Sequence, residues 1–141
     1  MRQSILRYFI SLLLVSLCIC SATSIFIISG SMKEDSEREM MYSVKLIEYN
    51  LDYSGDLNKQ IETLNPLAFS DDTRISVIDE KGKVLADTYK NDISSNHLKR
   101  EEVQQALHSS NHEGYAMRRS ETTNQPLLYA AYYKDNHIVR L

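Results

Sequence analysis

The spacing of hydrophobic residues changes several times along the chain, and each spacing predicts a different element. Residues 8–30, "YFISLLLVSLCICSATSIFIISG", carry no charge over 23 residues. A helix rises about 1.5 Å per residue, so this segment reaches roughly 35 Å, enough to cross a hydrocarbon core of about 30 Å. We therefore expect a transmembrane helix over residues 8–30, preceded by a short tail of residues 1–7.

A regular apolar stripe follows this segment. Met40, Val44, Ile47 and Leu51 recur at the spacing of one helix face. The pattern predicts that the transmembrane helix continues outward as a stalk. Two partners fit the stripe: the chain's own domain and a second copy of the chain. A rigid rod between bilayer and domain is what a transmembrane signal needs, so these four residues are the candidate signal-relay helix.

A second, shorter helix is expected after the stalk. Asp56 is suited to be its N-cap, because an aspartate oxygen accepts a hydrogen bond from the first helical turn. The apolar stripe and the end of this helix are formed by Leu57, Ile61, Leu64 and Pro66. The stalk and the short helix together occupy residues 31–67.

The stretch "RISVIDEKGKVLADT", residues 74–88, predicts two short strands joined by a tight turn. Gly82 supplies the positive φ that a short hairpin loop requires. The apolar run of Ile75, Val77 and Ile78 before the turn is almost continuous, which is typical of a strand covered on both faces. We expect this strand in the interior of a sheet.

A third helix and three further strands complete the pattern. "HLKREEVQQALHSS" has a helical stripe, and "GYAMRRSETTNQPLLYAAYYKDNHIVRL" alternates as three strands with turns at 122–125 and 135–136. The order of elements predicts an α+β fold with a five-stranded antiparallel sheet over residues 73–141. The inward face of the third helix is expected to consist of Leu98, Val103, Ala106 and Leu107.

Charges around the span predict its orientation. Arg2 and Arg7 precede it, while all 19 acidic residues follow it. The positive-inside rule then places the N-terminus in the cytoplasm and residues 31–141 outside the membrane. A cleaved signal peptide is disfavoured because apolar residues resume at Ile25, and a lipoprotein is disfavoured because no small residue precedes either cysteine.

Composition narrows the function further. The part after the span is acidic overall, so it has no electrostatic reason to bind nucleic acid. Both cysteines, Cys18 and Cys20, lie in the span, which leaves no disulfide and no thiolate metal site outside it. His108 and His112 stand four residues apart but lack a third metal ligand. We expect no catalytic site, no metal site and no cofactor in this chain.

Four stretches carry a family resemblance: "RISVIDEKGKVLADT", "NHLKREEVQQAL", "RRSETTNQPLLYAAYY" and "IVRL". With the span and stalk before them, they resemble the N-terminal region of membrane sensor histidine kinases, above all the phosphate-responsive PhoR type of Firmicutes. The resemblance covers residues 1–141 and implies a PAS-like (PDC or Cache) domain outside the membrane. Glu101 departs from it, because these domains often have proline at that position.

The resemblance implies the sensory input region of a two-component histidine kinase, which passes an external state to a cytoplasmic transmitter. That transmitter would bind ATP and phosphorylate a response regulator. Its motifs are absent here, and "HEGYAMRR" lacks the Arg-Thr-Pro run that follows the family's phosphoacceptor histidine. We expect the chain to be the front part of a longer protein and to form a homodimer in the cell membrane.

Two other classes of function stay open from the sequence. The same type of sensor domain also fits a chemoreceptor or a cyclic-dinucleotide enzyme. A membrane-anchored extracellular interaction module, without a signalling output, is the other reading.

The last strands carry the candidate ligand site. By the same resemblance, PAS-like domains bind small molecules between the sheet and the segment before the third strand. Alternation puts Tyr129 and Tyr133 on one face, and of Arg118 and Arg119 only one can face a pocket. An arginine beside tyrosines suits a small carboxylate or another anion. The structural alternative is a surface arginine with core tyrosines.

Overall fold

The structure is a computed structural model that describes residues 2–70, 73–89, 96–119 and 125–141. It divides into two compact units, residues 1–36 and 37–141. In its described part, the first unit is a stretch of one helix. The second unit contains all the strands. The two units are described separately.

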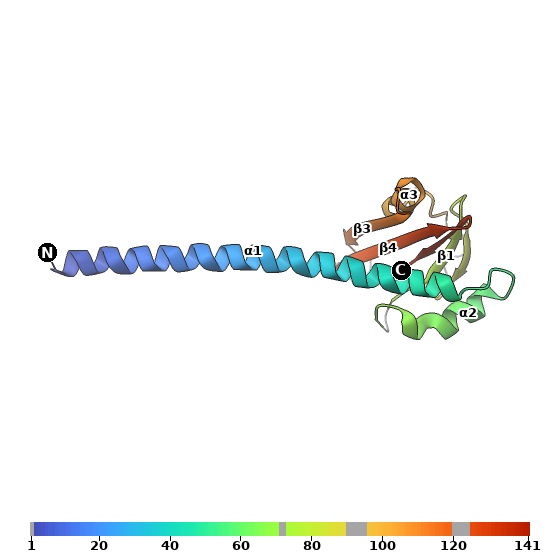
Figure 1. Cartoon of the computed structure of the whole chain (residues 1–141), viewed down its shortest axis with the longest axis horizontal. Helices are drawn as coiled ribbons and strands as arrows, with labels where there is room; N and C mark the ends of the chain where they lie inside the picture. The colour runs from blue at the N-terminus through green and yellow to red at the C-terminus, as the bar shows by residue number, and fades with distance from the viewer. Residues whose placement is uncertain (1, 71–72, 90–95, 120–124) are drawn as a thin grey trace. The chain divides into compact units, whose positions relative to one another are not determined.

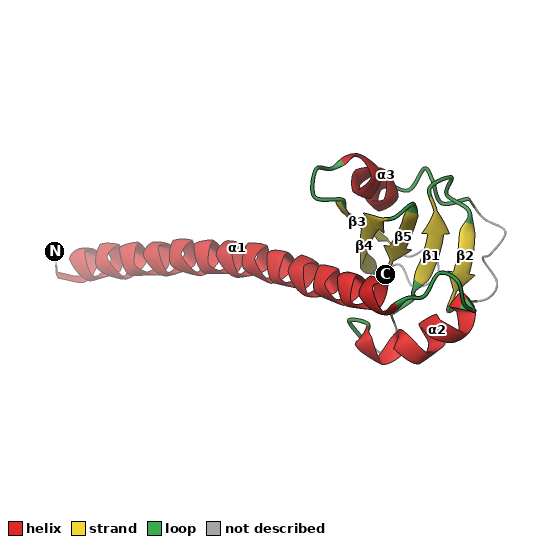
Figure 2. Cartoon of the chain, turned by 45° about the vertical axis from the view of Figure 1, so that its right-hand side comes forward, coloured by secondary structure: helices red, strands yellow, loops and turns green. Residues whose placement is uncertain are grey.

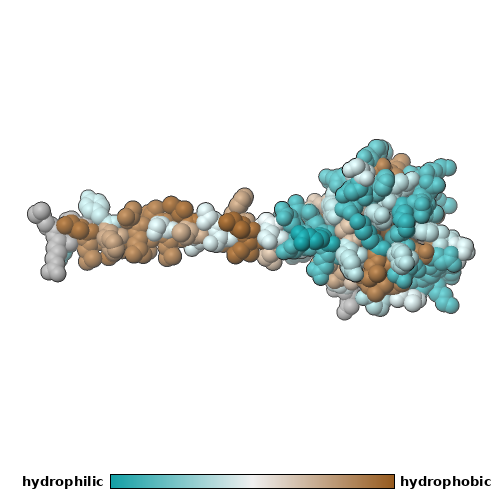
Figure 3. Space-filling model, viewed as in Figure 1, coloured by the Kyte–Doolittle hydropathy of each residue, from teal (hydrophilic) through white to brown (hydrophobic). Residues whose placement is uncertain are grey.

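Helix α1 (Arg2–Asn50) contains the span predicted from the sequence. The apolar side chains of its N-terminal part are exposed, and Figure 3 shows the hydrophobic surface that they form. Among the described residues, α1 is the one helix long and apolar enough to cross a membrane. Its length and composition fit a membrane location, while the side of the membrane on which the second unit lies stays a prediction.

The second unit is an α+β domain with one antiparallel sheet, as expected (Figure 2). The strands lie in the order β2-β1-β5-β4-β3, so β1 is an interior strand between β2 and β5. The strands are β1 (Ser76–Asp79), β2 (Val84–Asp87), β3 (Glu113–Arg119), β4 (Pro126–Lys134) and β5 (His137–Arg140). The helices of this unit, besides the end of α1, are α2 (Leu57–Leu64), the 3₁₀ helix Asn65–Leu67 and α3 (Glu101–His108).

Helices cover both faces of the sheet. The end of α1 and α2 lie on one face, and α3 lies on the other (Figure 1). Strand side chains alternate between the two faces, which assigns each residue to one of two clusters. The larger cluster, on the α1 side, contains Met40, Met41, Val44, Ile47, Ile61, Ile75, Val77, Ala86, Ala130, Val139 and Leu141. The smaller cluster, under α3, contains Ile78, Val103, Ala106, Ala131 and Ile138.

Local chemistry fixes the ends of the elements as the sequence predicts. The Asp56 side chain accepts a hydrogen bond from the backbone N–H of Lys59 and caps α2. Gly82 has φ +81°, and a Cβ atom there would meet Leu98. Asp135 and Asn136 both have positive φ, which is the conformation of a two-residue turn that matches the twist of its strands.

One boundary differs from the prediction. Leu98 lies before α3 and not on its inward face, because the Asn96 side chain accepts a hydrogen bond from the Leu98 N–H and forms a local turn. Helix α3 begins only at Glu101, with Val103 and Ala106 buried. Most of the predicted turn at residues 122–125 lies outside the described residues.

Val77→Asp should unfold the second unit. Val77 is fully buried in β1 between two strands, so the change removes apolar burial and leaves an unpaired charge in the core. We expect a loss of at least about 4 kcal/mol in the free energy of unfolding. Near-ultraviolet circular dichroism of the chain in detergent micelles reports this loss. Met117→Asp, at a half-exposed position of β3, is the control and should melt close to wild type.

Candidate functional site

The predicted signal-relay residues lie in the core of the second unit. Met40, Val44 and Ile47 are buried there, and Leu51 packs against them. A second copy of the chain therefore cannot use this stripe unless the core opens. The exposed side of the same helix carries Tyr42, which is 69% exposed. Whether the stripe relays a signal stays a prediction.

The four predicted ligand residues separate into different places. Arg118 and Tyr129 lie together, with the Arg118 guanidinium carbon 4.1 Å from the centre of the Tyr129 ring. Arg119 alternates to the opposite face and is exposed. Tyr133 lies further along β4, where its hydroxyl group donates a hydrogen bond to Asn136 and its ring contacts His112. The structure thus brings together two of the four.

A buried carboxylate joins Arg118 to an arginine that the sequence did not single out. Glu102, in the first turn of α3, has a fully buried side chain. Its Oε1 atom accepts hydrogen bonds from Arg118 Nη2 and Arg140 Nε, each at 2.8 Å. Arg140 also lies over the Tyr129 ring, at 4.8 Å. Helix α3 and strands β3, β4 and β5 therefore meet at one ionic cluster.

Burial sets the electrostatics of this cluster. It lowers the pKa of the Arg140 guanidinium from its ordinary value, and the Glu102 carboxylate opposes that effect. Arg118 and Arg74 lower the same pKa further, because like charges disfavour the protonated form. Both guanidiniums are therefore close enough to Arg140 to disfavour its charged form.

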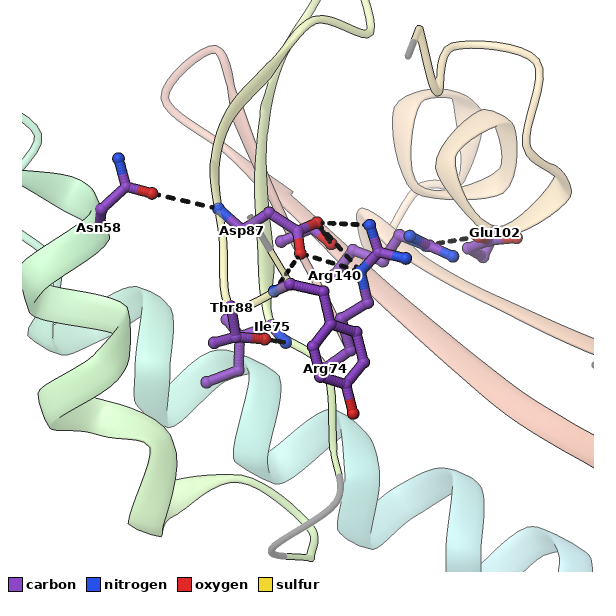
Figure 4. Close-up of polar contacts among 9 residues, drawn as sticks. Asn58, Arg74, Ile75, Asp87, Thr88, Glu102 and Arg140 are labelled. Atoms are coloured by element: carbon purple, nitrogen blue, oxygen red, sulfur yellow. Dashed lines mark hydrogen bonds and ion pairs between the residues drawn. The ribbon is translucent and has the colours of Figure 1, made fainter. Parts of the chain in front are cut away.

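A second buried carboxylate lies on the same face of the sheet (Figure 4). Asp87, Ser76 and Arg140 are direct neighbours across β2, β1 and β5. The Asp87 oxygens accept hydrogen bonds from Arg74 Nε at 2.9 Å, Arg74 Nη2 at 2.9 Å, the Ser76 hydroxyl at 2.8 Å and the Tyr89 N–H at 2.7 Å. Both oxygens of Asp87 are thus satisfied. We define the ionic face as Arg74, Ser76, Asp87, Glu102, Arg118, Tyr129 and Arg140.

One feature of the sequence could have predicted part of the ionic face. Glu102 precedes Val103 and lies four residues before Ala106, which places a charge among the inward positions of α3. Fully buried carboxylates are rare unless they are paired, so a charge at an inward position predicts a partner. Which partner it finds depends on Arg140, 38 residues away, and no local pattern shows that pairing.

Other candidate sites are weaker. A shallow cavity of about 260 Å³ is lined by Glu62, Asn65, Thr73, Thr88 and Tyr89. No group of three or more potential metal ligands occurs among the described residues.

Comparison with known proteins shows a fold and no family. No protein-family model matches the chain, and no curated protein matches it. The chain is similar to the crystal structure of the Bacillus subtilis YkuI protein, which has an EAL domain and was solved with its substrate c-di-GMP and calcium. The TM-score is 0.52 at 18% identity, over 76% of this chain and 30% of YkuI. The chain thus matches less than a third of YkuI, and the likeness concerns the fold alone.

Gly114→Ala should destabilise the second unit by displacing α3. Gly114 lies on β3 directly under this helix, and a Cβ atom there would overlap the Glu102 carbonyl oxygen and stand 2.7 Å from the Ala106 nitrogen. Both are backbone atoms, so the whole helix has to move. Overpacking of this kind costs about 1–3 kcal/mol, which a chemical denaturation curve measures. Gly30→Ala, where a Cβ atom meets nothing within 4 Å, should leave the midpoint unchanged.

Proposed function

We propose that the chain is the signal-input region of a membrane receptor, with residues 37–141 as a PAS-like sensor domain outside the cytoplasm. The receptor is a sensor histidine kinase that works as a homodimer and acts on a response regulator. The observation that carries the proposal is helix α1. Its N-terminal part fits a membrane span, and its last turns belong to the core of the second unit.

The construction of α1 favours signalling over simple anchoring. An anchor needs only a flexible link to its domain. Here the backbone is helical from Arg2 to Asn50, and Met40, Val44 and Ile47 are buried in the domain that the helix reaches. A domain that changes shape around these residues therefore acts on the helix itself. The α+β fold with one antiparallel sheet is compatible with a PAS-like sensor.

A cyclic-dinucleotide enzyme is the second candidate for the output. The support is the likeness of fold to part of YkuI, a protein with an EAL domain that was solved with c-di-GMP. In this version the sensor region is the same and only the cytoplasmic partner domain differs.

The orientation of the protein is tested first. Arg2 and Arg7 precede the uncharged span, so we expect protease added to intact protoplasts to remove residues after Ser31 and to spare an N-terminal tag. Immunoblots against both ends of the chain measure this, and lysed protoplasts are the control in which both ends are lost. An N-terminal tag that is digested in intact protoplasts, or a mature protein that begins near Thr23, contradicts the proposal.

Signal transfer through α1 is tested by changing its phase. Two alanines inserted between Glu34 and Asp35 rotate the helix by about 200° relative to the span, whereas seven add about two full turns and restore the phase. This position precedes the buried residues that begin at Met40, so the domain core is untouched. We expect two alanines to lock the output of the intact gene product, and seven to leave it responsive.

The measurement is performed in membrane vesicles from cells that express the intact gene product. Phosphate transfer from ATP supports the kinase output, and synthesis or hydrolysis of c-di-GMP supports the second candidate. Equal output from the two insertion variants contradicts signalling through α1. A gene product with neither activity contradicts both of these outputs and leaves the chemoreceptor and the interaction module as the alternatives.

A further inference from the structure

Glu102 holds two arginines through a single oxygen atom. Its Oε1 accepts both hydrogen bonds, from Arg118 and from Arg140. Within the described part of the chain, Oε2 is buried and has no hydrogen-bond partner. A carboxylate normally satisfies a guanidinium best through two parallel N–H···O bonds. Neither arginine receives that arrangement from Glu102, so the buried carboxylate is poorly matched to the pair that it occupies.

The arginine pair has unused donors and access to solvent. A guanidinium carries five N–H groups, and the side chains of Arg118 and Arg140 each donate one hydrogen bond to a described residue. The side chain of Arg118 is 27% exposed, compared with 6% for Arg140 and none for Glu102. Arg118, which lies over the ring of Tyr129, is therefore the member of the pair that a ligand reaches first.

Charge on the ionic face favours an added anion. Arg118 and Arg140 carry two positive charges and share the single negative charge of Glu102. Asp87 is fully engaged by Arg74, Ser76 and Tyr89. Glu102 is the partly satisfied member, so it is the carboxylate that a better ligand replaces.

We propose that Glu102 is an internal ligand, which occupies an oxyanion site formed by Arg118 and Arg140 and is displaced by a carboxylate or phosphate group of an external molecule. This inference rests on the proposed sensor function and assigns its ligand class. An oxyanion with two or more oxygens pairs with both guanidiniums at once. The displaced Glu102 turns toward solvent, while Val103 and Ala106 keep the rest of α3 on the sheet.

The test removes the internal ligand and measures anion affinity. Glu102→Gln keeps the shape of the side chain but loses its charge, so the arginine pair becomes available. With the full chain in nanodiscs of zwitterionic lipid, we expect succinate or inorganic phosphate to bind the variant at least tenfold more tightly than wild type. Chloride at equal ionic strength is the control, because it measures how far simple screening of the charges changes the signals. Arginine Nε–H signals in NMR spectra report the binding.

Two further variants separate the site from a general charge effect. Glu101→Gln removes the same charge from the same helical turn, at an exposed position, and should bind both anions as wild type does. Arg118→Gln added to Glu102→Gln should abolish the gain. A stronger response to phosphate indicates a phosphorylated ligand, and a stronger response to succinate indicates a carboxylate ligand. Both responses support the site.

Unchanged affinity in a folded Glu102→Gln variant overturns the proposal, as does a gain that survives the loss of Arg118. Where Glu102→Gln fails to fold, Glu102→Asp replaces it: the shorter carboxylate reaches the pair less well, and an affinity equal to wild type then overturns the proposal. The protease and insertion experiments do not involve Glu102. The sensor function can therefore fail or stand independently of this site.

Discussion

The last turns of α1 complete the core of the second unit, and the fold of this unit depends on that contact. Up to Gly30 the apolar side chains of α1 are exposed, and the composition of this part fits a membrane location. From Met40 onward they form a stripe against the sheet, and the opposite side carries polar and aromatic residues such as Tyr42 and Tyr49. Burial of one side chain of this size contributes about 1.5–3 kcal/mol, against about 5–15 kcal/mol for a whole domain. Among the described residues, the other helix on this face is α2, which has eight residues and adds Ile61 to the same cluster.

The two faces of the sheet differ in the kind of side chains that they bury. The α1 face is mostly apolar, and two ion pairs, Lys45–Glu113 and Lys134–Glu48, join α1 to the strands beside the apolar cluster. The α3 face is apolar under Val103 and Ala106 but ionic around Glu102. A buried ion pair contributes little net stability compared with apolar side chains of similar volume, and this is compatible with the displacement proposed for Glu102. A site that responds to a ligand is therefore expected on the α3 face.

Local chemistry explains how much of this fold the sequence predicts. The cap at Asp56, the glycine at position 82 and the two-residue turn at Asp135–Asn136 each depend on neighbours within a few residues. Helical and alternating patterns likewise need only local residues. Long-range pairing is different. From the sequence, the apolar stripe that begins at Met40 fits the chain's own sheet and a second copy of the chain equally well. The structure shows that it packs on its own sheet. The Glu102–Arg140 pair is undetermined for the same reason, since nothing near either residue specifies the other.

The end of β5 connects the two faces. Arg140 and Leu141 are consecutive, and their side chains point to opposite sides of the sheet: Arg140 to Glu102, and Leu141 into the cluster that contains Val44 and Ile47. Two backbone hydrogen bonds with Ala130 hold Leu141 in place, at 2.9 and 3.2 Å. In the proposed displacement, Arg140 therefore loses its carboxylate next to the residue that contacts the core around α1. Coupling between the sites needs an element whose arrangement both of them bias, and this strand end is the candidate because it contacts both.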